Sequence, residues 1–166
     1  MNLTLHTDYS LRILLYLAEH TDRPVATREI SEAYGVSRNH LVRVVETLQL
    51  HGFVKAATGR FGGVTLARDP AEINIGEVVR RTEPNFRIVE CFDAANNTCR
   101  ILPACSLRGV LEEALAAFVV VLEKYTLADL ARMKGSQRIS DFLPVQALGN
   151  RLPGADRGAR PQIGIR

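Results

Sequence analysis

Two short amphipathic segments separated by a glycine narrow the possible folds of this 166-residue chain more than any other feature. Residues 26–34 and 38–50 carry apolar side chains at helical spacing. Gly35 lies where a tight turn between helices needs a positive φ angle. Thr27 and Ser37 are suitable N-caps for the two helices. The pattern therefore predicts a helix-turn-helix.

A glycine-rich hairpin is predicted directly after the second helix. Residues 53–57 and 64–67 have the composition of short β-strands, and the intervening TGRFGG places Arg60 at the tip of the turn. A hairpin in this position makes the unit a winged helix. The wing would bring Arg60 to a phosphate or into a minor groove.

The rest of the chain predicts a mainly α-helical fold in which this hairpin is the only sheet. We expect a first helix over 1–20 and another over 73–82. A wide apolar stripe predicts one long helix over 106–134, roughly 40 Å in length, which either packs on the core of its own chain or forms a dimer seam. The predicted units are a winged helix-turn-helix domain (1–83), a loop (84–105), the dimerisation helix (106–134) and a disordered tail (135–166).

The net charge of +3 is not spread evenly over the sequence. Residues 135–166 alone carry +3, so residues 1–134 are neutral overall. Within them, residues 23–68 hold seven basic and three acidic side chains, a local charge of +4. A basic helix-turn-helix followed by a wing is typical of proteins that bind duplex DNA.

The candidate DNA contacts lie near the starts of the two helices and at the tip of the wing. Asn and Arg side chains can pair with base edges in the major groove, and hydroxyl groups can reach phosphates. The alternative is that these side chains form an ordinary solvated face. The candidates are Thr27, Arg28, Ser37, Arg38, Asn39, His40, Arg43 and Arg60.

Three cysteines, Cys91, Cys99 and Cys105, lie in a segment with little apolar periodicity. Their odd number and the lack of a signal-peptide pattern argue against a secreted disulfide framework and predict a cytoplasmic protein. The apolar runs are too short to cross a membrane. The spacing lacks the tight pairs that zinc sites use, whereas iron–sulfur clusters accept wider spacings. Inert thiols or one redox-active disulfide are the alternatives.

Several stretches taken together resemble the winged-helix iron–sulfur transcriptional repressors, some of which regulate cluster biogenesis and others of which sense nitric oxide. The resemblance is greater to the nitric-oxide sensors. It implies a homodimer that pairs through the long helix and carries a [4Fe–4S] or a [2Fe–2S] cluster. The stretches are LTLHTDYSLRILLYLA, YGVSRNHLVRVVETL, GRFGGVTLA, INIGEVVRRTEP, ILPACSL and YTLADL.

The resemblance also implies a set of cluster ligands, namely the three cysteines and Asp8 of the partner subunit. A carboxylate is a weak ligand for iron, which would leave one iron open to a diatomic molecule. Arg12 follows Asp8 by one helical turn and can pair with it. The alternative is that Asp8 is an ordinary acid at a helix start. Cluster-biogenesis regulators have a histidine where this chain has Arg108, so their ligand set is not expected here.

The resulting hypothesis is a repressor whose dimer binds a pseudo-palindromic operator and releases it when nitric oxide destroys the cluster. One alternative is a DNA-binding regulator that senses iron, cluster supply or redox state. Another is a cluster-carrying electron-transfer or scaffold protein. A cysteine-dependent enzyme is disfavoured, because none of the four histidines lies in or beside the cysteine segment.

Overall fold

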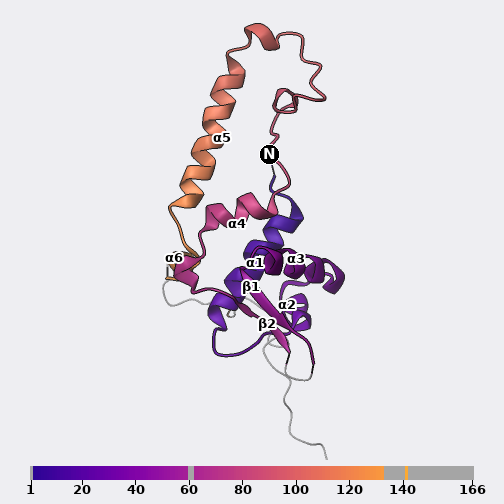
Figure 1. Cartoon of the computed structure of the whole chain (residues 1–166), viewed down its shortest axis with the longest axis vertical. Coiled ribbons are helices and arrows are strands. Elements are labelled where there is room, and N and C mark those ends of the chain that lie inside the picture. The colour runs from indigo at the N-terminus through magenta and orange to yellow at the C-terminus, as the bar shows by residue number, and fades with distance from the viewer. Residues whose placement is uncertain (1, 60–61, 133–140, 142–166) are drawn as a thin grey trace, which may run out of the picture.

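The helix-turn-helix is present in the computed structural model, which describes residues 2–59, 62–132 and 141. Helices α2 (Thr27–Tyr34) and α3 (Arg38–Leu50) are joined through Gly35, whose φ of 63° confirms the predicted left-handed turn (Figure 1). Ser37 occupies the predicted N-cap position of α3, but its side chain makes no capping hydrogen bond. Thr27 is not an N-cap: Ala26 holds that position and Thr27 is the first helical residue.

Helix α1 (Leu5–Glu19) packs against α3, the hairpin and α4 (Ile75–Thr82). Thr4 caps it by accepting a hydrogen bond from the Thr7 amide. The apolar stripe predicted for this helix faces the core, which lies among α1, α2, α3, α4 and the hairpin. The largest fully buried side chains are Tyr16, Phe53, Ile13, Leu14, Leu17, Ile30, Leu41, Leu48, Ile73 and Leu127.

The predicted wing is a two-stranded antiparallel hairpin. Strand β1 (Val54–Ala57) pairs with β2 (Gly63–Leu66), with Val54 opposite Leu66. Val25 adds a bridge to Val64, so the hairpin is tied to the loop before α2. Arg60 and Phe61 lie outside the described residues, so the predicted role of Arg60 stays a prediction.

Helix α4 (Ile75–Thr82) follows a short 3₁₀ turn, η1 (Pro70–Glu72). Asn74 caps α4 by accepting a hydrogen bond from the Glu77 amide. The segment from Glu83 to Ser106 then forms the predicted loop. It contains only two 3₁₀ turns, η2 (Glu90–Phe92) and η3 (Leu102–Ala104).

The single helix predicted over 106–134 is wrong. Helix α5 (Leu107–Glu123) ends before a short break, and α6 (Leu127–Arg132) follows it. Thr126 and Asp129 form a reciprocal capping pair, in which the Thr126 amide donates to Asp129 and the Asp129 amide donates to Thr126 Oγ1. This pair begins α6. The seventeen residues of α5 span roughly 25 Å rather than 40 Å.

Backbone pairing with the start of α4 accompanies the break. The Ile75 amide donates to the Tyr125 carbonyl at 3.0 Å, and the Leu127 amide donates to the Ile73 carbonyl at 2.8 Å. These bonds occupy groups that a continuous helix would have used internally. The chain therefore turns back toward the core, where Leu127 is fully buried.

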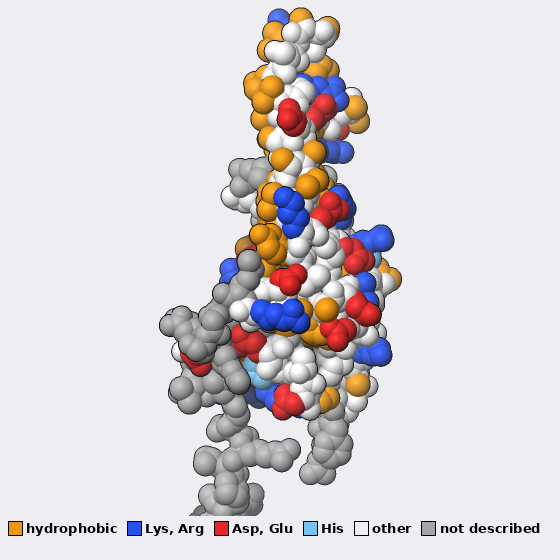
Figure 2. Space-filling model, turned by 90° about the vertical axis from the view of Figure 1, so that its left-hand side faces the viewer, with side chains coloured by type: hydrophobic (Ala, Val, Ile, Leu, Met, Phe, Trp, Pro, Cys, Tyr) orange, Lys and Arg blue, Asp and Glu red, His pale blue; other side chains and the backbone are white. Residues whose placement is uncertain are grey.

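Helix α5 extends away from the winged helix, and the loop leads from the end of α4 to the far end of α5 (Figure 1). Only Val119 of α5 is buried in the chain. Figure 2 shows hydrophobic side chains along this helix. Its large exposed apolar residues include Leu107, Val110, Val120 and Val121.

No helix in the described part of the chain is long and apolar enough to span a membrane. The tail predicted over 135–166 lies, apart from Asp141, outside the described residues.

Candidate functional site

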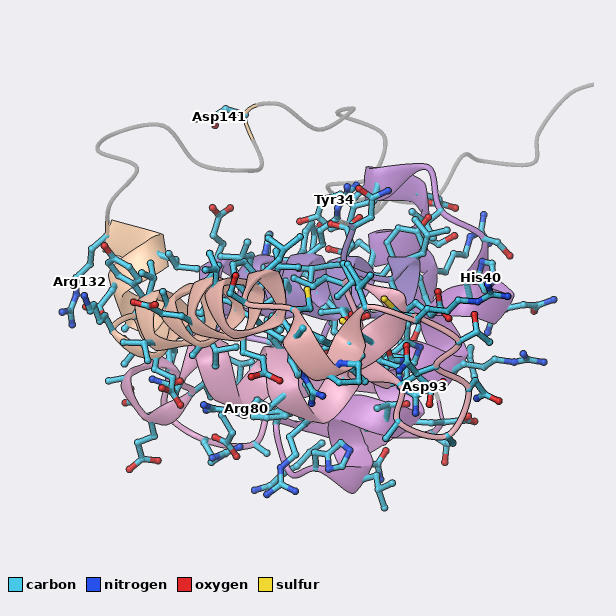
Figure 3. The ribbon with its side chains drawn as sticks, turned by 90° about the horizontal axis from the view of Figure 1, so that it is seen from above. Tyr34, His40, Arg80, Asp93, Arg132 and Asp141 are labelled. Carbon is cyan, nitrogen blue, oxygen red and sulfur yellow. The ribbon has the colours of Figure 1, made fainter. Side chains whose placement is uncertain are left out.

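The outer face of α3 carries most of the predicted DNA contacts. Its inner face is buried through Leu41, Val44, Val45 and Leu48, so the remaining positions face solvent. Ser37, Arg38, Asn39, His40 and Arg43 are all exposed. In Figure 3, His40 and Arg132 of α6 lie at opposite sides of the molecule. The candidate contact surface of α3 is therefore exposed and far from α6.

The two candidates from α2 differ in their surroundings. Thr27 is half-buried at the start of the helix, whereas Arg28 is exposed. The Arg28 guanidinium donates to Glu32 at 2.6 Å, one turn along the helix. An exposed pair of this kind contributes little to stability, so Arg28 can exchange Glu32 for another acceptor at small cost.

The carboxylate of Glu29 ties α2 to the loop before it through an ion pair and to α1 through a tyrosine hydrogen bond. Arg23 donates two hydrogen bonds to the Glu29 carboxylate, at 2.6 and 2.9 Å, and the Tyr16 hydroxyl donates a third at 2.9 Å. Burial alone would raise the pKa of Glu29, but these three donors outweigh it and hold that pKa below its ordinary value. The pKa of Tyr16 is raised by burial and by Glu29. The ion pair fixes the helix that supports α3.

A chain of contacts joins Asp8 to the outer face of α3. The Asp8 carboxylate forms two short contacts with the Arg12 guanidinium, at 2.7 and 3.0 Å, as predicted. The Arg12 guanidinium lies 5.8 Å from the centre of the Tyr9 ring. That ring lies 6.4 Å from the ring of His40, within the range for an aromatic contact. Sequence reasoning missed Tyr9, because no local pattern reveals a contact between α1 and α3.

The three cysteines are free and half-buried on the loop between α4 and α5. In the first turn of α5, the Arg108 guanidinium donates a hydrogen bond to Glu112 at 2.8 Å, and this bond raises the pKa of Arg108. Thiols are the donors that iron–sulfur clusters use, so the chemistry of the donors fits. Within the described residues of one chain, no three Cys, His, Asp or Glu side chains are grouped closely enough to hold a metal. The cysteines and Asp8 remain predicted ligands.

Glu83 connects the start of this loop to the start of α1. Its Oε2 atom accepts hydrogen bonds from the Thr4 amide (3.1 Å), the Thr4 hydroxyl (3.1 Å) and the Thr7 hydroxyl (2.6 Å). Thr7 is fully buried, and Asp8 is the next residue. One carboxylate thus fixes the first turn of α1 to the end of α4.

The end of α5 is clamped on the start of α4. The Asn74 side-chain amide donates to the Glu123 carbonyl at 2.7 Å, and Arg80 forms an ion pair with the Glu123 carboxylate. Gly76 lies against the backbone of Glu123. These contacts set the direction in which α5 leaves the winged helix.

Comparison with known proteins agrees with this arrangement. A relative from Bacillus subtilis, the HTH-type transcriptional regulator NsrR, is 51% identical over 135 residues, which is 81% of this chain and 92% of that protein. Among solved structures, one similar protein is CymR, the global cysteine regulator of B. subtilis, with a TM-score of 0.64 and 25% identity. The match covers 81% of this chain and 98% of CymR. IscR from T. potens is similar with a TM-score of 0.65 and 24% identity, and the match covers 85% of this chain and 96% of that one. At this level of identity the similarity shows a shared fold only.

A family model described as "Iron-dependent Transcriptional regulator" matches residues 3–133, which include every described helix and strand. The match confirms the resemblance drawn from the sequence and the prediction of a regulator rather than an enzyme. The chain belongs to the Rrf2 family of transcriptional regulators.

Proposed function

We propose that this chain is a homodimeric repressor that binds a pseudo-palindromic DNA operator through α3 and the wing, and releases it in response to nitric oxide. The strongest support is the position of three free, half-buried thiols on the segment that joins the DNA-binding domain to α5. The name of the B. subtilis relative, NsrR, agrees with the resemblance to nitric-oxide sensors.

The charge and exposure of α3 support the DNA-binding part of the proposal. Arg38, Asn39 and Arg43 offer the forked donors that read base edges, while the helix start and its Ser37 hydroxyl can reach a phosphate. Two such helices in a dimer would enter successive major grooves.

The exposed apolar residues of α5 support the dimer. Leu107, Val110 and Val121 lie on one side of the helix by their spacing and are each about half or more exposed, and such an apolar stripe is favoured where a second helix covers it. A dimer made through α5 would set the distance between the two copies of α3.

Cys91, Cys99, Cys105 and Asp8 of the partner subunit are the residues that would hold an iron–sulfur cluster. When bound, the cluster supplies iron atoms that combine with nitric oxide. Three thiolates and one carboxylate match a [4Fe–4S] cluster with one weakly held iron, and a [2Fe–2S] cluster is the alternative.

The residues around Asp8 supply a route from this site to α3. Arg12 contacts both Asp8 oxygens, so an Asp8 that gave one oxygen to iron would keep at most one of these contacts. Arg12 lies over Tyr9, and Tyr9 contacts His40 on the outer face of α3. A change at Asp8 therefore alters the surroundings of a predicted DNA contact.

Anaerobic absorption and DNA binding, measured together, test the proposal. The full chain is purified without oxygen, and a duplex that it binds is selected from a randomised library. We expect a brown protein with thiolate-to-iron absorption, and nitric oxide should bleach that absorption and abolish the gel shift. A colourless, zinc-loaded protein contradicts the cluster, and DNA binding that survives complete bleaching contradicts the sensing mechanism.

Serine variants of the three cysteines are the matched controls. Each should lose the absorption while keeping the thermal unfolding transition of the winged helix, because none of the three cysteines belongs to the hydrophobic core. If an iron chelator or an oxidant releases DNA and nitric oxide does not, the chain is a regulator of iron supply or redox state instead.

A further inference from the structure

Val42 is an apolar side chain on the outer face of α3, and it is 40% exposed. Single exposed apolar residues are common on protein surfaces, so its exposure alone means little. Its position is more informative. Arg38 and Asn39 lie one helical turn before Val42, and Arg43 follows it directly; all three are exposed.

The surroundings of Val42 restrict what it can contact. An isopropyl group neither donates nor accepts hydrogen bonds, so it cannot pair with a phosphate or a polar base edge. The major-groove edges of the base pairs carry one apolar group, the 5-methyl of thymine. The first half of a recognition helix is the part that reaches these edges, and Val42 is the fifth residue of α3.

We propose that Val42 recognises the 5-methyl group of a thymine in the major groove of each operator half-site. The proposal rests on the proposed DNA binding through α3 and adds a specificity-determining residue to it. Asn39 and Arg43 would read polar edges of neighbouring base pairs, while Val42 selects thymine over cytosine, which lacks the methyl group.

Replacing thymine by deoxyuridine tests this contact, because deoxyuridine keeps the base pairing and lacks only the methyl group. The full chain is used with the duplex selected from a randomised library, and each thymine is replaced in turn. We expect one position per half-site at which the replacement weakens binding by about four-fold, the effect of losing one buried methyl-sized group.

Val42→Ala should weaken binding to the unmodified duplex and abolish the further loss at that position. Val42→Thr keeps one methyl group and should restore part of the discrimination. Leu50→Ala is the matched control, because Leu50 is also an exposed apolar residue of α3, 80% exposed, but lies at the other end of the helix. It should keep the deoxyuridine profile of the unaltered chain.

Two results would overturn the inference while leaving DNA binding intact. One is a Val42→Ala variant with an unchanged deoxyuridine profile. The other is a variant that weakens binding equally with and without the methyl group, which indicates a sugar contact. Failure to select any duplex would overturn the proposed function itself. Unchanged thermal unfolding of the variants shows that they fold.

Discussion

Gly76→Ala should destabilise the chain, although alanine normally favours a helix. Gly76 lies in the first turn of α4, against the end of α5. A Cβ atom there would lie 2.5 Å from Cγ of Glu123 and 3.0 Å from its backbone nitrogen. The Glu123 backbone cannot simply move aside, because its carbonyl accepts the Asn74 hydrogen bond and its side chain pairs with Arg80.

The magnitude follows from two opposing terms. Inserting a methyl group into a packed contact costs about 1–3 kcal/mol, while replacing a helical glycine by alanine returns at most ~1 kcal/mol. When the full ~1 kcal/mol is returned, we therefore expect Gly76→Ala to lower the free energy of unfolding by up to about 2 kcal/mol. Gly109→Ala in α5 is the matched control. Nothing lies within 4 Å of its added Cβ, so the same substitution should stabilise by about 0.5–1 kcal/mol.

Denaturant unfolding of the full-length, cluster-free protein measures both free energies, and sedimentation shows whether the variants keep the same oligomeric state. Opposite signs for the two variants support the clamp between α4 and α5. If Gly76→Ala is as stable as Gly109→Ala, the contact with Glu123 does not constrain α5, and the reasoning is refuted. The direction of α5 would then have to be set elsewhere.

Three further predictions concern the charged residues. The pKa of Glu29 lies below its ordinary value of 4.5, so folding stability should fall as the pH drops through this lowered value. Glu29→Gln should remove that part of the pH dependence, measured by urea unfolding between pH 3 and 6. An unchanged profile would contradict the lowered pKa. Arg43→Ala should weaken DNA binding about ten- to hundred-fold in gel shifts. Arg132→Ala, at the opposite side of the molecule from the exposed start of α3, should leave binding unchanged. Equal effects of the two variants would remove Arg43 from the DNA-binding surface. Asp8→Ala should change the anaerobic absorption spectrum of the cluster. It should shift the stability of the cluster-free chain by under ~1 kcal/mol, because the ion pair between Asp8 and Arg12 is exposed. An unaltered spectrum would make Asp8 an ordinary acid at a helix start.

The helix-turn-helix could be predicted from the sequence because its signals are local. The positive φ of Gly35 and the apolar spacing of α3 depend on residues a few positions apart. The i,i+4 pair of Asp8 with Arg12 has the same character. Such features need little from the rest of the chain.

The break between α5 and α6 had a local signal that apolar periodicity concealed. Thr126 and Asp129 have the spacing of a capping box, within a stretch whose apolar residues continue the stripe of α5. The backbone pairing of Tyr125 with Ile75 is long-range, and it decides that the chain turns back at this point. A wide apolar stripe alone therefore overestimated the helix.

The sequence by itself determined the DNA-binding elements, the thiols that could serve as cluster ligands and the family, because these depend on residue type and short spacing. Only the tertiary structure decided which side chains meet across elements: Tyr9 with His40, Glu83 with Thr7, and Gly76 with Glu123. The physical reason is that these contacts join residues brought together by packing of the whole core. No pattern along one segment specifies the position of another.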